Sequence, residues 1–122
     1  MKTALRRLWS RPQGAFGKPL IFGLRRNGSL ISVATLATPQ LKFRLRTQTR
    51  AEAVTGAGDL LVYADTVNNP PLYNVQYNWD ASDPDTPGVY IVELDALDSG
   101  GAPITFPSDE RFLIRILPDV GA

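Results

Sequence analysis

The sequence predicts an all-β sandwich. From about residue 20 to residue 117, short stretches of alternating apolar and polar residues recur, and turn-forming residues separate them. Ten glycines and ten prolines are spread along the 122 residues, which favours many turns over long helices. A hydrophobic content of 43% is sufficient for one domain with a buried core. We therefore expect roughly seven or eight short antiparallel strands in two layers.

Residues 1–17 are predicted to form a basic N-terminal arm ahead of this domain, either extended or as a short helix. Ala4, Leu5, Leu8 and Trp9 share one face if the segment is a short helix, which Pro12 would end. A transit peptide or a disordered tail is the alternative to a docked arm. No continuous apolar stretch follows the first charges, which argues against a secretory signal. The residues expected to anchor the arm on a partner are Lys2, Arg6, Arg7, Trp9 and Arg11.

The domain is expected to occupy residues 18–118, with a short tail at 119–122. Leu20, Phe22 and Leu24 alternate with other residues in the first predicted strand. The dipeptide Asn27-Gly28 predicts a tight hairpin, because such turns need positive φ angles. A short strand over Leu30–Val33 should return from it, and Pro39 should end the connection that follows.

The sharpest alternation lies in Gln40–Arg46, where three apolar residues alternate with Lys42, Arg44 and Arg46. This pattern predicts a strand with a buried face and a cationic face. A solvated surface is the simplest interpretation of the cationic face, and a phosphate or an acidic neighbour is the alternative. The aromatic residue, Phe43, alternates to the apolar side, which disfavours nucleic acid. Lys42, Arg44 and Arg46 are therefore candidate residues for binding a protein partner.

The middle of the chain predicts a loop over Thr47–Gly58, with a possible helical turn at Ala51–Val54, and then a strand over Leu60–Ala64. A turn-rich loop over Val67–Leu72 comes next. Tyr73–Trp79 then alternates again, with Tyr73, Tyr77 and Trp79 on one side. These rings either pack in the core or form an exposed platform for carbohydrate; strands of sandwiches favour the core.

The last third predicts three strands. They cover Gly88–Asp95, Pro103–Phe106 and Arg111–Leu117, with a hairpin loop at Asp98–Gly101 and a turn at Pro107–Glu110. Phe112, Ile114 and Ile116 should face the interior of the last strand, and Leu113 and Arg115 should face outward.

Three aspartates precede the Gly88–Asp95 strand, in the stretch WDASDPDTPGVY. A calcium loop would need alternating oxygen ligands and a distal Glu, whereas here Pro84 separates Asp83 from Asp85. Asp side chains also cap turns by accepting backbone N–H groups, and Gly88 permits an unusual φ. We interpret the cluster as a turn, with Tyr90 placed for a tyrosine corner.

The composition argues against an enzyme. The chain has no Cys and no His, so it lacks thiolate and imidazole groups for catalysis or for binding metals. We assign no catalytic residue, cofactor or metal. The net charge is +1, but residues 1–51 hold eleven Lys/Arg and no acid, and residues 52–122 hold twelve acids and two Arg. Such asymmetry suggests contact with a charged partner or with copies of the same chain, unless interleaved strands neutralise it.

The segment Trp79–Tyr90 resembles part of a known family. Together with Glu93, Ile104–Ser108 and the strand Arg111–Leu117, it is similar to the Ig-like domain at the N-terminus of phage baseplate upper proteins. Members show a pattern such as W-x-x-x-D-T-D-T-P-G-x-Y-x-x-E, then a hairpin, then T-F-P and an apolar strand. The opening Pro19–Arg25, Asn27-Gly28 and Leu41–Arg46 also fit. This chain differs in having Asp83-Pro84-Asp85 where Asp-Thr-Asp is usual.

The resemblance implies an Ig-like antiparallel β-sandwich in a non-enzymatic phage virion protein. We expect an adaptor attached to the tail or baseplate by its basic arm, present in several copies and contacting other virion proteins. A capsid decoration protein is the alternative, and a carbohydrate- or cell-surface-binding module is the third possibility. Neither a membrane nor nucleic acid is an expected partner.

Overall fold

A computed structural model describes residues 7–26, 28–106 and 112–118. The described chain is all-β, as the alternation predicts. It contains eleven strands and two 3₁₀ helices, η1 (Val33–Thr35) and η2 (Arg50–Glu52). Neither helix, in this described part, is long and apolar enough to cross a bilayer.

The strands are β1 (Arg7–Pro12), β2 (Leu20–Phe22), β3 (Arg25–Arg26), β4 (Ser29–Leu30), β5 (Ala37–Leu45), β6 (Val54–Thr55), β7 (Asp59–Val62), β8 (Val75–Asn78), β9 (Gly88–Leu97), β10 (Pro103–Phe106) and β11 (Phe112–Leu117). This number exceeds the seven or eight expected. The extra strands are β1, which was predicted as an arm, and two-residue pieces such as β6, which alternation cannot reveal.

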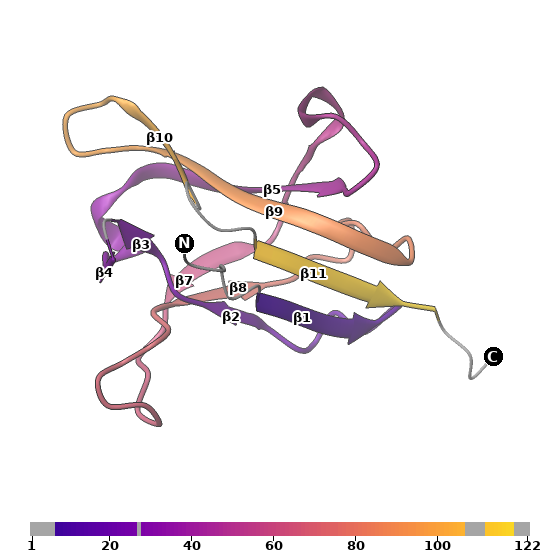
Figure 1. The fold of residues 1–122 in the computed structure, drawn as a ribbon, viewed down its shortest axis with the longest axis horizontal. Helices are drawn as coiled ribbons and strands as arrows, with labels where there is room; N and C mark the ends of the chain where they lie inside the picture. The colour runs from indigo at the N-terminus through magenta and orange to yellow at the C-terminus, as the bar shows by residue number, and fades with distance from the viewer. Residues whose placement is uncertain (1–6, 27, 107–111, 119–122) are drawn as a thin grey trace, which may run out of the picture.

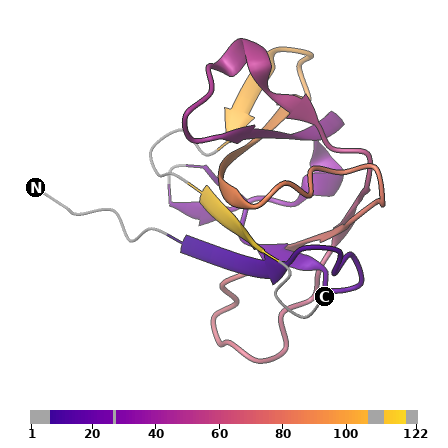
Figure 2. The same cartoon turned by 90° about the vertical axis from the view of Figure 1, so that its right-hand side faces the viewer.

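The strands form two main sheets and a small hairpin. The large sheet has the order β1-β11-β9-β5-β6, and β10 also pairs with β9. The small sheet has the order β2-β8-β7, and β3 pairs with β4. In Figure 1, β5 and β9 lie above β2, β7 and β8, and β1 lies beside β11. Figure 2 shows the same arrangement from the side, with β1 and β11 still adjacent. Among the described strands, every pairing is antiparallel except that of β1 with β11.

The core lies between the two sheets. Rings from opposite sheets meet there: Phe22 lies 5.1 Å from Phe112, and Phe43 lies 5.8 Å from Tyr77, between ring centroids. In most predicted strands the alternating apolar residues are the buried ones, so these inner faces are confirmed; in the predicted strand Leu60–Ala64, Leu60 is half-buried and Leu61 and Val62 are exposed. The buried residues of the inner faces include Leu20, Phe22, Leu24, Leu41, Val75, Tyr90, Val92, Leu94, Ile114 and Ile116. Burying each such large side chain stabilises the fold by about 1.5–3 kcal/mol.

The region around Pro39 differs from the prediction. The hairpin of β3 and β4 is confirmed, with Gly28 at φ +82°. The return strand is shorter than predicted, because Ser32 caps η1 by accepting the Ala34 N–H. Pro39 lies inside β5 instead of ending the connection. The ladder to β9 shifts register between Ala37 and Gln40, and proline is tolerated at such a bulge.

The predicted arm is, over Arg7–Pro12, a strand of the large sheet. Trp9 lies opposite Ile114 and Arg11 opposite Ile116 in the parallel ladder with β11. The boundary predicted at residue 17 and the helical alternative for the arm are therefore wrong for these residues. The expectations for Lys2 and Arg6, the turn at Pro107–Glu110 and the tail at 119–122 fall outside the described residues.

Candidate functional site

The Arg11 side chain, on β1, is buried in the fold. Its exposure is 0%, and its Nη1 donates to Asp85 Oδ1 at 2.7 Å. Its Nη2 donates to the Pro84 carbonyl oxygen at 2.7 Å. The guanidinium carbon lies 4.6 Å from the centroid of the Trp79 ring and 4.7 Å from that of Phe16. The expectation that the Arg11 side chain contacts an external partner is therefore wrong, because this side chain is fully buried within the domain.

These contacts explain how the fold accommodates a buried cation. Burying a charge is costly unless it is paired and hydrogen-bonded, and Asp85 supplies the pairing. Partial burial by itself raises the pKa of Asp85, but hydrogen bonds from the Gly14 amide and from Arg11 outweigh it and lower the pKa. The bonds from Gly14 N–H to the two carboxylate oxygens measure 3.0 and 3.1 Å. Asp85 thus holds both β1 and the turn that follows it.

Trp9, also predicted for the arm, packs mainly on its own chain. Its ring stacks on Trp79 at a centroid separation of 5.7 Å, and Lys18 Nζ lies 5.3 Å from the Trp9 centroid. Trp9 is half-buried and packs against the core. The backbone position of Arg7 is described, but its side chain is not, so its role in partner binding stays a prediction.

The three aspartates before β9 accept hydrogen bonds from different sets of donors. Asp83 is 5% exposed, and its carboxylate accepts from the Tyr77 hydroxyl at 2.6 Å and from the Ala57 amide at 2.7 Å. It also accepts the Asp80 amide at 3.0 Å. Three donors thus satisfy this buried carboxylate, as a buried polar group requires.

The hydroxyl of Tyr77 extends this network to a glycine-rich loop. It accepts the Gly58 amide at 2.8 Å, and burial raises the pKa of Tyr77 well above its usual value. A Cβ on Gly58 would lie 1.9 Å from the Asn78 carbonyl oxygen, so this position requires glycine. The Gly56–Gly58 loop therefore closes one end of the core.

Asp80 and Tyr90 complete the turn. The Asp80 carboxylate accepts from the Ser82 hydroxyl and amide, and these bonds lower the Asp80 pKa. The Tyr90 hydroxyl donates to the Thr86 carbonyl oxygen at 2.7 Å, which is the geometry of a tyrosine corner. Burial raises the Tyr90 pKa. The turn interpretation is confirmed; in the described part of the chain, no group of three acidic side chains converges as a metal site would need.

The aromatic stripe of β8 packs in the core. Tyr77 is 1% exposed and Trp79 is buried against Phe43 and Tyr77, with ring centroids 5.4 and 5.2 Å away. Only Tyr73 is partly exposed. These rings therefore do not form the exposed platform that carbohydrate stacking would require.

Lys42, Arg44 and Arg46 share the outer face of the large sheet. The first two alternate with buried Leu41 and Phe43 on β5. Arg46 follows the strand, and its amide donates to the Val89 carbonyl oxygen at 2.9 Å. Lys42 Nζ donates to the Thr55 hydroxyl at 2.6 Å, and Arg44 Nη1 donates to the Gln48 carbonyl oxygen at 2.9 Å.

The ladders of β9 with β5 and with β11 place Arg115 on the same face, a position that the sequence did not predict. Val89 pairs with Arg115, and Ile91 pairs with both Arg44 and Leu113. Arg115 comes from the acidic half of the sequence. Its outward direction was predictable from the alternation, but the pairing of its strand, β11, with β9 was not. We call the outward residues Lys42, Arg44, Arg46, Val89, Ile91, Leu113 and Arg115 the cationic face. Ile91 is 8% exposed and Val89 and Leu113 are half-buried, so the cations surround an apolar centre.

Two acids lie at one end of the cationic face. Glu93 pairs with Lys42 in the ladder, and Asp95 pairs with Gln40 and accepts from the Thr105 hydroxyl at 3.0 Å. The other end, around Arg46 and Arg115, lies farther from these carboxylates in the ladder. Positive charge is therefore concentrated around the apolar centre and at that end.

Comparison with protein-family models, with curated proteins and with solved structures gives no match for this chain.

Proposed function

We propose that this chain is a non-enzymatic structural protein of a phage virion, an Ig-like β-sandwich that serves as an adaptor in the tail or baseplate. The observation that carries the proposal is that the aspartate and tyrosine side chains of the segment Trp79–Tyr90 form hydrogen bonds within the fold. This is the part that resembles the baseplate family, and Asp80, Asp83, Asp85 and Tyr90 all bond within the fold. Residues engaged in this way support a scaffold role and not a catalytic one.

Two features support the Ig-like interpretation. Two sheets enclose one core, and Tyr90 ties the start of β9 back to the preceding turn through Thr86. A tyrosine corner of this kind is a hallmark of Ig-type sandwiches.

The surface that we assign to partner binding is the cationic face. Charged groups around an apolar centre are typical of protein interfaces, where apolar area gives affinity and charges give orientation. Arg11 is fully buried and paired with Asp85, so we do not assign it to the attachment surface. Lys2, Arg6 and Arg7 remain predicted anchors.

The proposal is tested on particles purified from cells that carry the genome encoding this chain. Mass spectrometry should find the chain in a constant ratio to the major capsid protein, and antibody labelling in the electron microscope should mark the tail. Labelling of the head would assign the alternative, capsid decoration. Absence of the chain from purified particles would overturn a virion role altogether.

A variant distinguishes specific attachment through the cationic face from non-specific enclosure of the chain in the particle. Arg46→Glu with Arg115→Glu reverses two exposed charges of the cationic face and should greatly reduce incorporation. Arg26→Glu is the matched control, because Arg26 is exposed on the β3–β4 hairpin, outside this face. Equal incorporation of both variants would show that the cationic face is not the attachment surface.

A further inference from the structure

We propose that copies of this chain associate head to tail, with the cationic face of one copy against the outer face of β7 and β8 of the next. The inference rests on the proposed function, in which the cationic face is the protein-binding surface. It adds the identity of the partner, a second copy of the chain.

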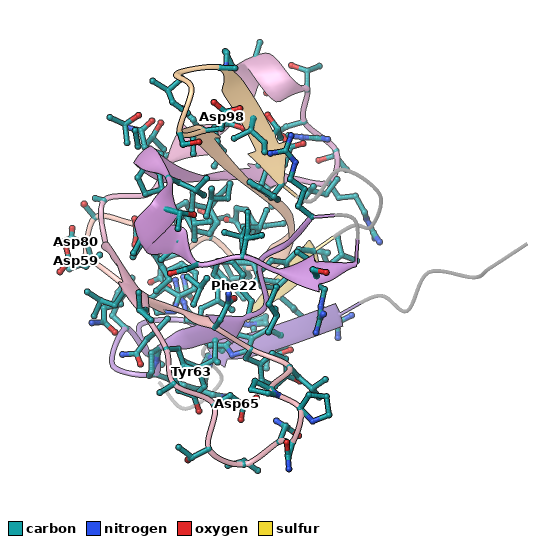
Figure 3. The ribbon with its side chains drawn as sticks, turned by 90° about the vertical axis from the view of Figure 1, so that its left-hand side faces the viewer. Phe22, Asp59, Tyr63, Asp65, Asp80 and Asp98 are labelled. Atoms are coloured by element: carbon teal, nitrogen blue, oxygen red, sulfur yellow. The ribbon has the colours of Figure 1, made fainter. Side chains whose placement is uncertain are left out.

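The outward residues of β7 and β8 include one acid, Asp59, and no Lys or Arg, and a second exposed acid, Asp80, follows β8. Asp59 pairs with Asn78 and Leu61 pairs with Gln76, and these four residues alternate with the core-facing Leu60, Val75 and Tyr77. The whole stretch from Asp59 to Asp80 contains three Asp and no Lys or Arg. Figure 3 shows Asp59 and Asp80 together at one edge, with Asp65 in the loop beyond Tyr63. We call Asp59, Leu61, Gln76, Asn78 and Asp80 the acidic face.

The two faces also match in their apolar parts. Leu61 is 45% exposed next to Asp59 on the acidic face, whereas the half-buried Val89 and Leu113 lie in the middle of the cationic face. A leucine left this exposed gains free energy when a partner covers it. Opposite charges on one side of it, Asp59 on one copy and Arg46 and Arg115 on the next, would orient the contact.

The geometry makes the contact heterologous. The acidic and cationic faces belong to the two different sheets of one sandwich, which Figure 1 shows one above the other, and their residues alternate with those that face the shared core. Two cationic faces would repel each other, so a symmetric dimer through this surface is disfavoured. A heterologous contact repeats from copy to copy, and it closes into a ring or continues as a filament. Rings of copies would suit an adaptor in a tail or baseplate.

Sedimentation of the intact chain tests the proposal. At low ionic strength the average mass should rise with protein concentration from that of one chain to that of two or more, and added salt should reverse the rise. Variant C carries Arg46→Glu and Arg115→Glu, which block the cationic face. Variant A carries Asp59→Asn and Leu61→Asn, which remove the charge and the exposed leucine of the acidic face without adding positive charge that could attract the altered face of variant C. Each variant alone should remain monomeric, and Arg26→Glu should associate like the unchanged chain.

The mixture of the two variants is decisive. Variant C retains a normal acidic face and variant A a normal cationic face, so an equimolar mixture should form dimers and nothing larger. An unchanged chain that stays monomeric, variants that associate normally, or a mixture that stays monomeric would each overturn the proposal. Circular dichroism confirms that the variants are folded. A monomeric chain that is still found in purified particles would overturn self-association alone and leave the virion role standing.

Discussion

Arg11 and Asp85 form a 2.7 Å ion pair although they are 74 residues apart in the sequence. The pair joins the first strand of the large sheet to the turn before its central strand. It makes residues 7–12 part of the domain, and it uses one of the three aspartates that could otherwise be taken for metal ligands.

Replacing Arg11 by Ala should destabilise the fold strongly. The change truncates a fully buried side chain that packs on Trp79 and Phe16, and such truncations typically cost about 2–5 kcal/mol; the remaining Asp85 is 32% exposed and keeps its Gly14 bonds. Urea unfolding followed by tryptophan fluorescence measures the change. Arg46→Ala, an exposed arginine, should change stability by less than about 0.5 kcal/mol. Equal losses in the two variants would contradict the importance of the Arg11–Asp85 pair.

Truncation at two positions separates the strand from the segment before it. Deletion of residues 1–6 leaves β1 intact, so the thermal midpoint should change little. Deletion of residues 1–17 removes β1 with Trp9 and Arg11, exposes the Trp79 ring and leaves Asp85 unpaired. The longer deletion should lower the thermal midpoint markedly or prevent folding. A stable product lacking residues 1–17 would restore the interpretation of this segment as a separate arm.

Tyr90 should contribute to the free energy of unfolding in two ways, through its buried ring and through its hydroxyl group. Tyr90→Ala removes a buried ring and should cost about 3–5 kcal/mol. Tyr90→Phe keeps the ring and loses only the hydrogen bond to the Thr86 carbonyl, so it should cost about 0.5–1.5 kcal/mol. Chemical denaturation measures both. A near-neutral alanine variant would show that the inner face of β9 is assigned wrongly.

Asp65 should order the loop between β7 and β8 in a pH-dependent way. Its carboxylate accepts the amides of Val67, Asn68, Leu72 and Tyr73, and the side-chain amide of Asn68. The hydrogen bond from the Asn68 side chain is the main cause that holds the Asp65 pKa far below its ordinary value. The loop presents Val67, which is 85% exposed, so its order depends on this carboxylate more than on burial.

A depressed carboxyl pKa gives the sign of this effect. The stabilisation is complete above the unfolded-state pKa of about 3.9 and is lost as pH falls through the lower folded-state pKa. Amide hydrogen exchange should therefore show protected Leu72 and Tyr73 amides at neutral pH. Asp65→Asn should speed their exchange at neutral pH and weaken its acid dependence. Unchanged exchange in this variant would show that other contacts hold the loop.

The strands and their inner faces could be predicted because alternation is a local property. In Gln40–Arg46 and Arg111–Leu117, the side-chain period of two assigns each residue to a face without knowledge of the neighbouring strand. The Asn27-Gly28 hairpin and the turn before Tyr90 were predictable for the same reason, since turn chemistry depends on a few adjacent residues. Two-residue strands such as β6 carry too little pattern to be recognised.

The sequence by itself therefore determined an all-β chain, its inner faces and the structural use of its aspartates. Only the tertiary structure decided that Arg7–Pro12 pairs with β11, that Arg11 is buried against Asp85, and that Arg115 joins Arg44 and Arg46 on one face. The physical reason is that strand pairing is set by packing between distant segments, which local periodicity does not record. The local sequence of a basic segment is the same whether its arginine binds a partner protein or pairs with an acidic residue of its own fold.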